Sequence, residues 1–213
     1  MKRDIYEKLV TWKSSPRRKP LLLQGARQTG KTFILKEFGQ NEYQCVVYCN
    51  FEEDPGLDRL FQRDLNPERI LAELSIYRNV EINSGANLVI FDEIQASNGA
   101  LNSLKYFAEQ SPDVHMAAAG SLLGVKLSSP GSFPVGKVNF LHLYPMTFLE
   151  FLDAMGESRY RKMIETIDRL VPINDAFHST LIDLLKRYYF VGGMPEPVKH
   201  FAETGNGRET REI

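Results

Sequence analysis

The sequence has little cysteine and no long apolar run. Its two cysteines, Cys45 and Cys49, lie in a segment with a strand pattern. That spacing separates them by about 13 Å along a strand, too far for a disulfide or a shared metal ion. No stretch approaches the roughly 20 apolar residues of a membrane span, and the first residues lack the apolar core of a signal peptide. We therefore expect a cytoplasmic protein without a membrane contact.

The sequence also lacks an excess of either charge. Its 213 residues include 26 basic and 27 acidic side chains, which gives a formal net charge of -1. This balance exerts no general attraction on nucleic acid or on anionic membranes. Nucleic-acid binding is therefore possible, but the charge does not indicate it. The four histidines are scattered singly, so the sequence predicts no metal site built from His, Cys and carboxylate clusters.

Strand and helix patterns alternate up to about residue 145, and only helical patterns follow. The expected strands cover residues 21–23, 45–51, 88–93, 114–121 and 138–144. Between them, apolar residues recur at helical spacing, and we expect one of these helices to run from Lys31 to a stop at Gly39. Asn66 and Pro67 are typical of a helix start, and Thr147 with Glu150 predicts a capping box. The pattern predicts a three-layer α/β core.

These patterns divide the chain into two expected domains. Residues 1–146 form the α/β core, in which residues 1–19 are an N-terminal helix and a linker. Residues 147–213 form a small helical lid.

The first chemical motif is a glycine-rich loop between an expected strand and an expected helix. It reads Gly25, Ala26, Arg27, Gln28, Thr29, Gly30, Lys31 and Thr32, which matches G-x-x-x-x-G-K-[ST] in full. Such a loop turns its backbone N–H groups and the positive end of the helix toward phosphate oxygens. Lys31 is expected to neutralise the β and γ phosphates and Thr32 to reach Mg²⁺. We also expect Phe33, the next residue, to contact the nucleotide.

The second motif is the apolar run Leu88–Phe91, which delivers Asp92 and Glu93 at its carboxyl end. Ligands bind at this edge of parallel sheets. Asp92 suits the coordination shell of Mg²⁺ through a water molecule. Glu93 is placed to orient and polarise the attacking water. Together with the glycine-rich loop, this pair predicts an ATPase that needs Mg²⁺. GTP is disfavoured as the nucleotide because the sequence has no [NT]-K-x-D guanine motif.

Ser121 ends the fourth expected strand, where its hydroxyl could hydrogen-bond the γ-phosphate or the attacking water. A glycine-serine turn without a catalytic role explains it equally well.

The chain resembles the AAA-type ATPases of bacteria and archaea in which an ATPase core precedes a second, poorly characterised domain. The segments that carry the resemblance are GARQTGKT, LVIFDEIQ, AAGS, VGKVNFLHLYPMTFLEF and GGMPEPV. The resemblance implies a five-stranded parallel sheet in the order 5-1-4-3-2, with the strand of Ser121 between the other two site strands. It also implies that Pro195, in Gly193-Met194-Pro195, lies against adenine. A glycine that ends one helix, followed by prolines that stop it, is the alternative interpretation.

The chain departs from that family at one position and stops earlier. Lys137 stands where the family is expected to carry arginine, and a lysine cannot form the planar fork of an arginine finger. Because relatives continue for about another domain, we expect this chain to be the ATPase part of a longer protein. Its partners would be ATP or ADP and either another protein or that further domain, and its oligomeric state stays open.

Four functions remain at this point. The leading one is an ATP-driven conformational switch or motor module. A scaffold that holds nucleotide without turnover and an ATPase stimulated by nucleic acid are the alternatives. A small-molecule kinase is disfavoured because the segment after Ser121 offers only Lys126 and Lys137, where a kinase lid needs arginines.

Overall fold

The structure is a computed structural model that describes residues 1–121, 136–168, 172–210 and 212–213. Its chain divides into two compact units. One consists of residues 5–143, here called the α/β unit, and the other of residues 1–4 with 144–213, here called the helical unit. None of the helices in these described ranges is long and apolar enough to cross a membrane.

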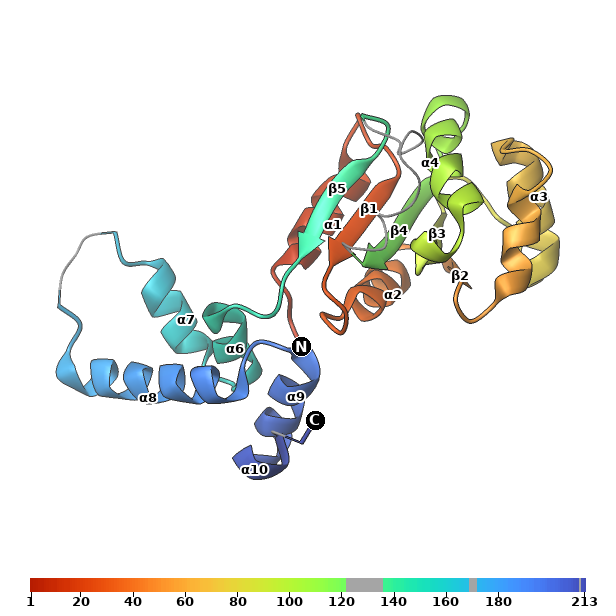
Figure 1. The fold of residues 1–213 in the computed structure, drawn as a ribbon. Helices are drawn as coiled ribbons and strands as arrows, with labels where there is room; N and C mark the ends of the chain where they lie inside the picture. The colour runs from red at the N-terminus through yellow and green to blue at the C-terminus, as the bar shows by residue number, and fades with distance from the viewer. Residues whose placement is uncertain (122–135, 169–171, 211) are drawn as a thin grey trace. The chain divides into compact units, whose positions relative to one another are not determined.

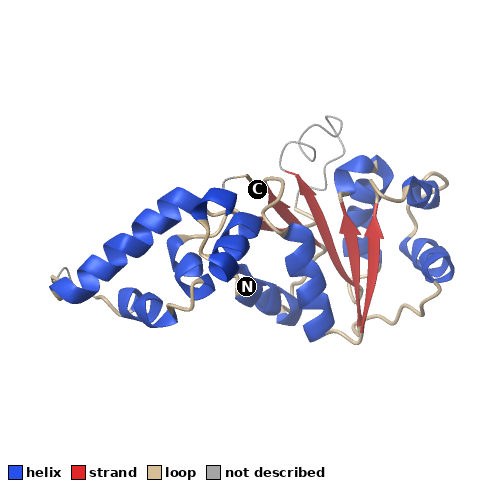
Figure 2. Ribbon diagram, turned by 90° about the horizontal axis from the view of Figure 1, so that it is seen from below, coloured by secondary structure: helices blue, strands red, loops and turns tan. Residues whose placement is uncertain are grey.

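The α/β unit contains a parallel sheet of five strands. They are β1 (Leu21–Gly25), β2 (Cys45–Asn50), β3 (Asn87–Asp92), β4 (His115–Ser121) and β5 (Asn139–Leu143). Their order across the sheet is β2-β3-β4-β1-β5, and every pairing is parallel. This is the order 5-1-4-3-2 that the family resemblance implied, and the expected three-layer α/β fold is confirmed (Figures 1 and 2).

Helices cover both faces of the sheet because its strands are apolar on both faces. On one face, Leu21, Leu23 and Ile90 pack against α1 (Ile5–Ser14) and α2 (Lys31–Glu42). On the other face, Leu22 and Val89 belong to a cluster that includes residues of the other helical segments. These are the 3-10 segments η1 (Pro55–Phe61) and η2 (Ile94–Ala96), α3 (Pro67–Arg78) and α4 (Asn98–Gln110).

The ends of two helices show how well local signals predict structure. The Asn66 side chain accepts hydrogen bonds from two backbone N–H groups at the start of α3, and Pro67 is its first residue, as predicted. The predicted stop at Gly39 is wrong, because α2 continues to Glu42. A Cβ atom at Gly39 would lie 2.5 Å from Cγ2 of Val46. This glycine therefore allows α2 to approach β2 closely rather than ending the helix.

The described residues of the helical unit form five helices and no strand. These are α6 (Phe148–Ala154), α7 (Ser158–Glu165), α8 (Asp175–Val191), α9 (Pro195–Thr204) and α10 (Gly207–Thr210). The predicted capping box is present at the start of α6, where Thr147 and Glu150 bond each other's backbone. Two small apolar clusters pack these helices together, one around Leu152 and Leu184 and one around Phe151 and Val198.

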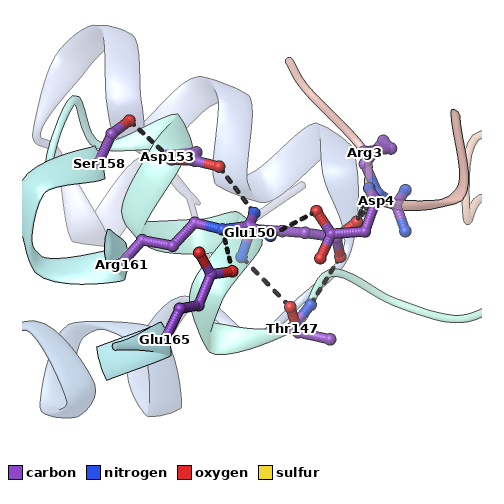
Figure 3. A network of polar contacts seen from close by, with 8 residues as sticks. All are labelled: Arg3, Asp4, Thr147, Glu150, Asp153, Ser158, Arg161 and Glu165. Carbon is purple, nitrogen blue, oxygen red and sulfur yellow. Dashed lines mark hydrogen bonds and ion pairs between the residues drawn. The ribbon is translucent and has the colours of Figure 1, made fainter. Parts of the chain in front are cut away.

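A polar network holds residues 1–4 in the helical unit (Figure 3). Arg3 Nε lies 3.0 Å from Glu150 Oε1, and both side chains are almost fully buried. The same carboxylate oxygen accepts a hydrogen bond from the backbone N–H of Asp4. Arg161 in α7 binds the carboxylates of Asp4 and Asp153 at 2.8 and 2.7 Å. Charged groups thus supply much of the contact between the first residues and α6 and α7.

Candidate functional site

The glycine-rich loop connects the end of β1 to the start of α2, as its motif predicted. A Cβ atom at Gly25 would lie 2.3 Å from the carbonyl oxygen of Leu143 in β5, so only glycine fits there. Gly30 caps α2 with a φ of 89°, and Gln28 also has a positive φ of 62°. Left-handed backbone is costly for a residue with a side chain. The loop therefore holds a strained, curled backbone at the N-terminus of a helix, which is the geometry that binds anions.

Lys31 is buried at the base of this loop. Its Nζ atom donates hydrogen bonds to the carbonyl oxygens of Gly25 at 3.2 Å and Ala26 at 2.8 Å. Burial lowers the pKa of Lys31, while the charges of Glu93 and Asp92 raise it. The ammonium group is thus hydrogen-bonded to the loop and interacts electrostatically with the carboxylates of Glu93 and Asp92.

The two predicted halves of the site meet in one hydrogen bond. Thr32 Oγ1 in the first turn of α2 donates to Asp92 Oδ2 at the end of β3 over 2.6 Å. The Asp92 side chain is buried, with 1% of the residue exposed. Hydroxyl and carboxylate oxygens are the ligands that Mg²⁺ prefers. The residues present therefore fit the predicted Mg²⁺ site.

Glu93 follows Asp92 in a left-handed conformation with a φ of 48°. Its backbone N–H donates to Asp92 Oδ1 at 3.0 Å. Its side chain accepts a hydrogen bond from Nε2 of Gln95, which also lies 3.4 Å from Oε1 of Glu52. The strained turn thus lies directly after β3, and the amide of Gln95 holds the carboxylate of Glu93.

The remaining predicted contacts lie at different positions around the loop. Ser121 is directly opposite Gly25 in the β1–β4 pairing, so the strand order brings it to the carboxyl edge of the sheet between the two motifs. Arg27 and Phe33 are exposed, Phe33 by 58%. The position of Ser121 is compatible with a phosphate or water contact, which stays a prediction.

Three other predicted residues lie outside the loop region. Pro195 belongs to the helical unit and is the first residue of α9, while Gly192 caps α8 with a φ of 81°. The helix boundary interpretation thus describes the local structure, and the contact with adenine stays a prediction. Lys137 forms an ion pair with Glu109 at 2.8 Å. Lys126 lies outside the residues that the structure describes.

Sequence reasoning missed two residues of the site. The hydroxyl of Tyr48 in β2 donates to Asp92 Oδ2 at 2.8 Å, and Gln95 holds Glu93. A signal for Tyr48 was present, since Tyr48 and Asn50 share one face near the carboxyl end of a strand. No spacing rule indicated Gln95, because its side chain reaches Glu93 only through the left-handed turn.

The parallel sheet, its strand order and the glycine-rich loop between β1 and α2 define the fold as that of a P-loop NTPase. Comparison with protein families matches residues 17–152 to the AAA domain. The chain therefore belongs to the AAA family of ATPase domains. No curated protein matches the chain.

Solved structures share this fold at low sequence identity. A Walker-type ATPase of Pyrococcus abyssi has a TM-score of 0.56 and 17% identity, over 98% of this chain and 70% of that one. Drosophila ORC bound to DNA has a TM-score of 0.55 and 16% identity, over 92% of this chain and 58% of that one. AMPPCP-bound DnaA from Aquifex aeolicus has a TM-score of 0.51 and 11% identity, over 93% of this chain and 57% of that one. At these identities the likeness shows the fold.

Proposed function

We propose that the α/β unit binds ATP with Mg²⁺ and hydrolyses it to ADP and phosphate. The observation that carries this proposal is the 2.6 Å hydrogen bond between Thr32 and Asp92, formed beside the buried ammonium of Lys31. It joins the two motifs that P-loop ATPases use to hold phosphates and Mg²⁺. DnaA from Aquifex aeolicus, which shares this fold, binds AMPPCP, and this agrees with a nucleotide ligand.

Each residue then has one task. The loop N–H groups and Lys31 bind the β and γ phosphates, and Thr32 with Asp92 holds the metal. When bound, Mg²⁺ would neutralise charge that develops on the phosphates. Glu93 orients a water molecule and takes a proton from it as its oxygen bonds to the γ-phosphorus and the bond to the ADP oxygen breaks. Ser121 is proposed to contact the γ-phosphate or this water.

Hydrolysis in such a domain serves as a conformational switch or a motor step. We propose a protein partner, or a further domain of the same protein, as the element on which it acts. The chain spans less than three fifths of the ORC and DnaA chains with which it shares a fold.

The test of the proposal replaces Glu93 by Gln. This change keeps the size of the side chain and leaves Asp92 in place, but it removes the charge that polarises water. Hydrolysis should fall by roughly 10² to 10⁴ while ATP affinity barely changes. Single-turnover measurements with excess protein are preferable, because an arginine finger supplied by a partner can be worth about 10³ or more in rate, and the chain is assayed without one.

Glu81→Gln is the matched control, since Glu81 is an exposed acid in the connection from α3 to β3. It should hydrolyse ATP at the wild-type rate. Equal rates for wild type and Glu93→Gln at matched ATP occupancy would contradict the catalytic role and favour a scaffold that only holds nucleotide. Duplex DNA added to the same assay tests the remaining alternative. The near-neutral charge predicts no stimulation.

A further inference from the structure

The Asp92 carboxylate is held by more donors than the two motifs supply. Oδ2 accepts hydrogen bonds from Thr32 Oγ1 at 2.6 Å and from the Tyr48 hydroxyl at 2.8 Å. Oδ1 accepts one from the backbone N–H of Glu93 at 3.0 Å. These donors come from α2, β2 and the turn after β3. The carboxylate is thus fixed from three directions, one of which no motif predicted.

Tyr48 is itself held so that its proton is directed at Asp92. Nδ2 of Asn50 lies 3.3 Å from the Tyr48 oxygen and donates to it, which occupies an acceptor position of the phenol. The ammonium of Lys36 lies 3.6 Å from the centre of the Tyr48 ring, within cation–π range. A tyrosine hydroxyl keeps its proton at neutral pH, so it acts as a donor to the carboxylate.

We propose that Tyr48 is a positioning residue for Mg²⁺, which holds the Asp92 carboxylate in the orientation that the metal site needs. This inference rests on the proposed function, because it gives Asp92 its role at the metal. The terminal torsion of an aspartate side chain is soft. The Thr32 hydroxyl restrains Asp92 Oδ2 through one hydrogen bond, but the same hydroxyl is also proposed to bind the metal. The hydrogen bond from Tyr48 adds a second restraint on the same oxygen from a different strand, so that metal binding starts from an ordered carboxylate.

Tyr48→Phe tests this role because it removes one hydroxyl and keeps the ring under Lys36. Fluorescent ATP analogue is titrated in EDTA and then at increasing Mg²⁺. The Mg²⁺ concentration for half-maximal enhancement of binding should rise about tenfold, as for other groups that orient metal ligands. Affinity in EDTA should stay at the wild-type value, because the loop and Lys31 are unchanged.

Tyr43→Phe is the matched control. Its hydroxyl is also partly buried and hydrogen-bonded, at 2.7 Å to Nδ1 of His115, but it does not contact Asp92. This variant should show the wild-type Mg²⁺ dependence. An equal shift in both variants, or a loss of affinity in EDTA for Tyr48→Phe, would show a structural role and overturn the inference.

Failure of the inference and failure of the proposed function give different results. If wild-type protein binds the analogue equally well in EDTA and in Mg²⁺, the metal site itself is wrong and the proposed function fails with it. If wild type shows the Mg²⁺ dependence and Tyr48→Phe matches it, only the positioning role of Tyr48 is refuted.

Discussion

The α/β unit and the helical unit are stabilised in different ways. Two large apolar clusters fill the two faces of the sheet. The helical unit has two smaller clusters and adds the buried pair of Arg3 with Glu150 and the ion pairs of Arg161. Apolar burial is non-directional, whereas a buried ion pair depends on each partner. We therefore expect loss of a site residue to leave the α/β unit folded, and loss of a buried charge to destabilise the helical unit.

The largest expected effect on ligand binding comes from a buried charge in the α/β unit. Lys31→Ala should weaken ATP binding by roughly 10²-fold or more, because the phosphates would lose the cation that we propose binds them. Fluorescent-nucleotide titration measures this loss, with Lys186→Ala in the helical unit as the control. Lys186 forms an exposed pair with Asp183. Unchanged affinity in folded Lys31→Ala would contradict the phosphate site.

The second effect is on stability rather than binding. Arg3→Met leaves Glu150 buried without its cation and should destabilise the helical unit by about 3 kcal/mol. Far-UV circular dichroism during denaturation follows helices in both units. Tryptophan fluorescence follows the α/β unit alone, because the single tryptophan of the sequence, Trp12, is buried in α1.

The dichroism transition should therefore shift to lower denaturant, and the fluorescence transition should shift less. Glu150→Gln in the Arg3→Met background should recover part of the loss, since it removes the uncompensated charge. Lys186→Met breaks an exposed pair and should cost under about 1 kcal/mol. Equal shifts for Arg3→Met and Lys186→Met would mean that the buried pair is not important for the helical unit.

The smallest effect is a pH dependence within the α/β unit. Burial, followed by the positive charges of Arg18 and Lys13, lowers the pKa of His115 to about 4, although Asp113 raises it. In the unfolded chain the pKa is about 6.5. Because the unfolded chain binds the proton first, stability from His115 is present above pH 6.5 and is lost as the pH falls toward 4. We expect a loss of about 2 kcal/mol by pH 4.5.

Denaturation followed by Trp12 fluorescence at several pH values measures this loss. His115→Gln keeps a hydrogen-bonding side chain beside Tyr43 but cannot titrate. Its stability should fall less between pH 6.5 and 4.5 than that of the wild type. Parallel pH curves for the two proteins would assign the acid sensitivity to other groups.

The sequence predicted the strands, their order through the family resemblance, and the meeting of the two motifs. These features depend on local patterns and on a loop whose geometry follows from its glycines. Gly39 was misread because a glycine that permits close packing looks the same in sequence as one that ends a helix. Tyr48 and Arg3 were missed because their partners lie 44 and 147 positions away in the sequence. Gln95 was missed because only the left-handed turn at Glu93 brings its amide to the carboxylate two positions earlier.

The chain passes between its two compact units twice, once between Asp4 and Ile5 and once between Leu143 and Tyr144. In topological terms the helical unit is assembled from two separate stretches of sequence. A single backbone cut at Asp4–Ile5 leaves the units covalently joined through β5. A cut at Leu143–Tyr144 leaves residues 1–4, which pack in the helical unit, as the covalent continuation of the α/β unit. The buried ion pair of Arg3 and Glu150 then holds residues 1–4 to residues 144–213 without a peptide bond between the two fragments.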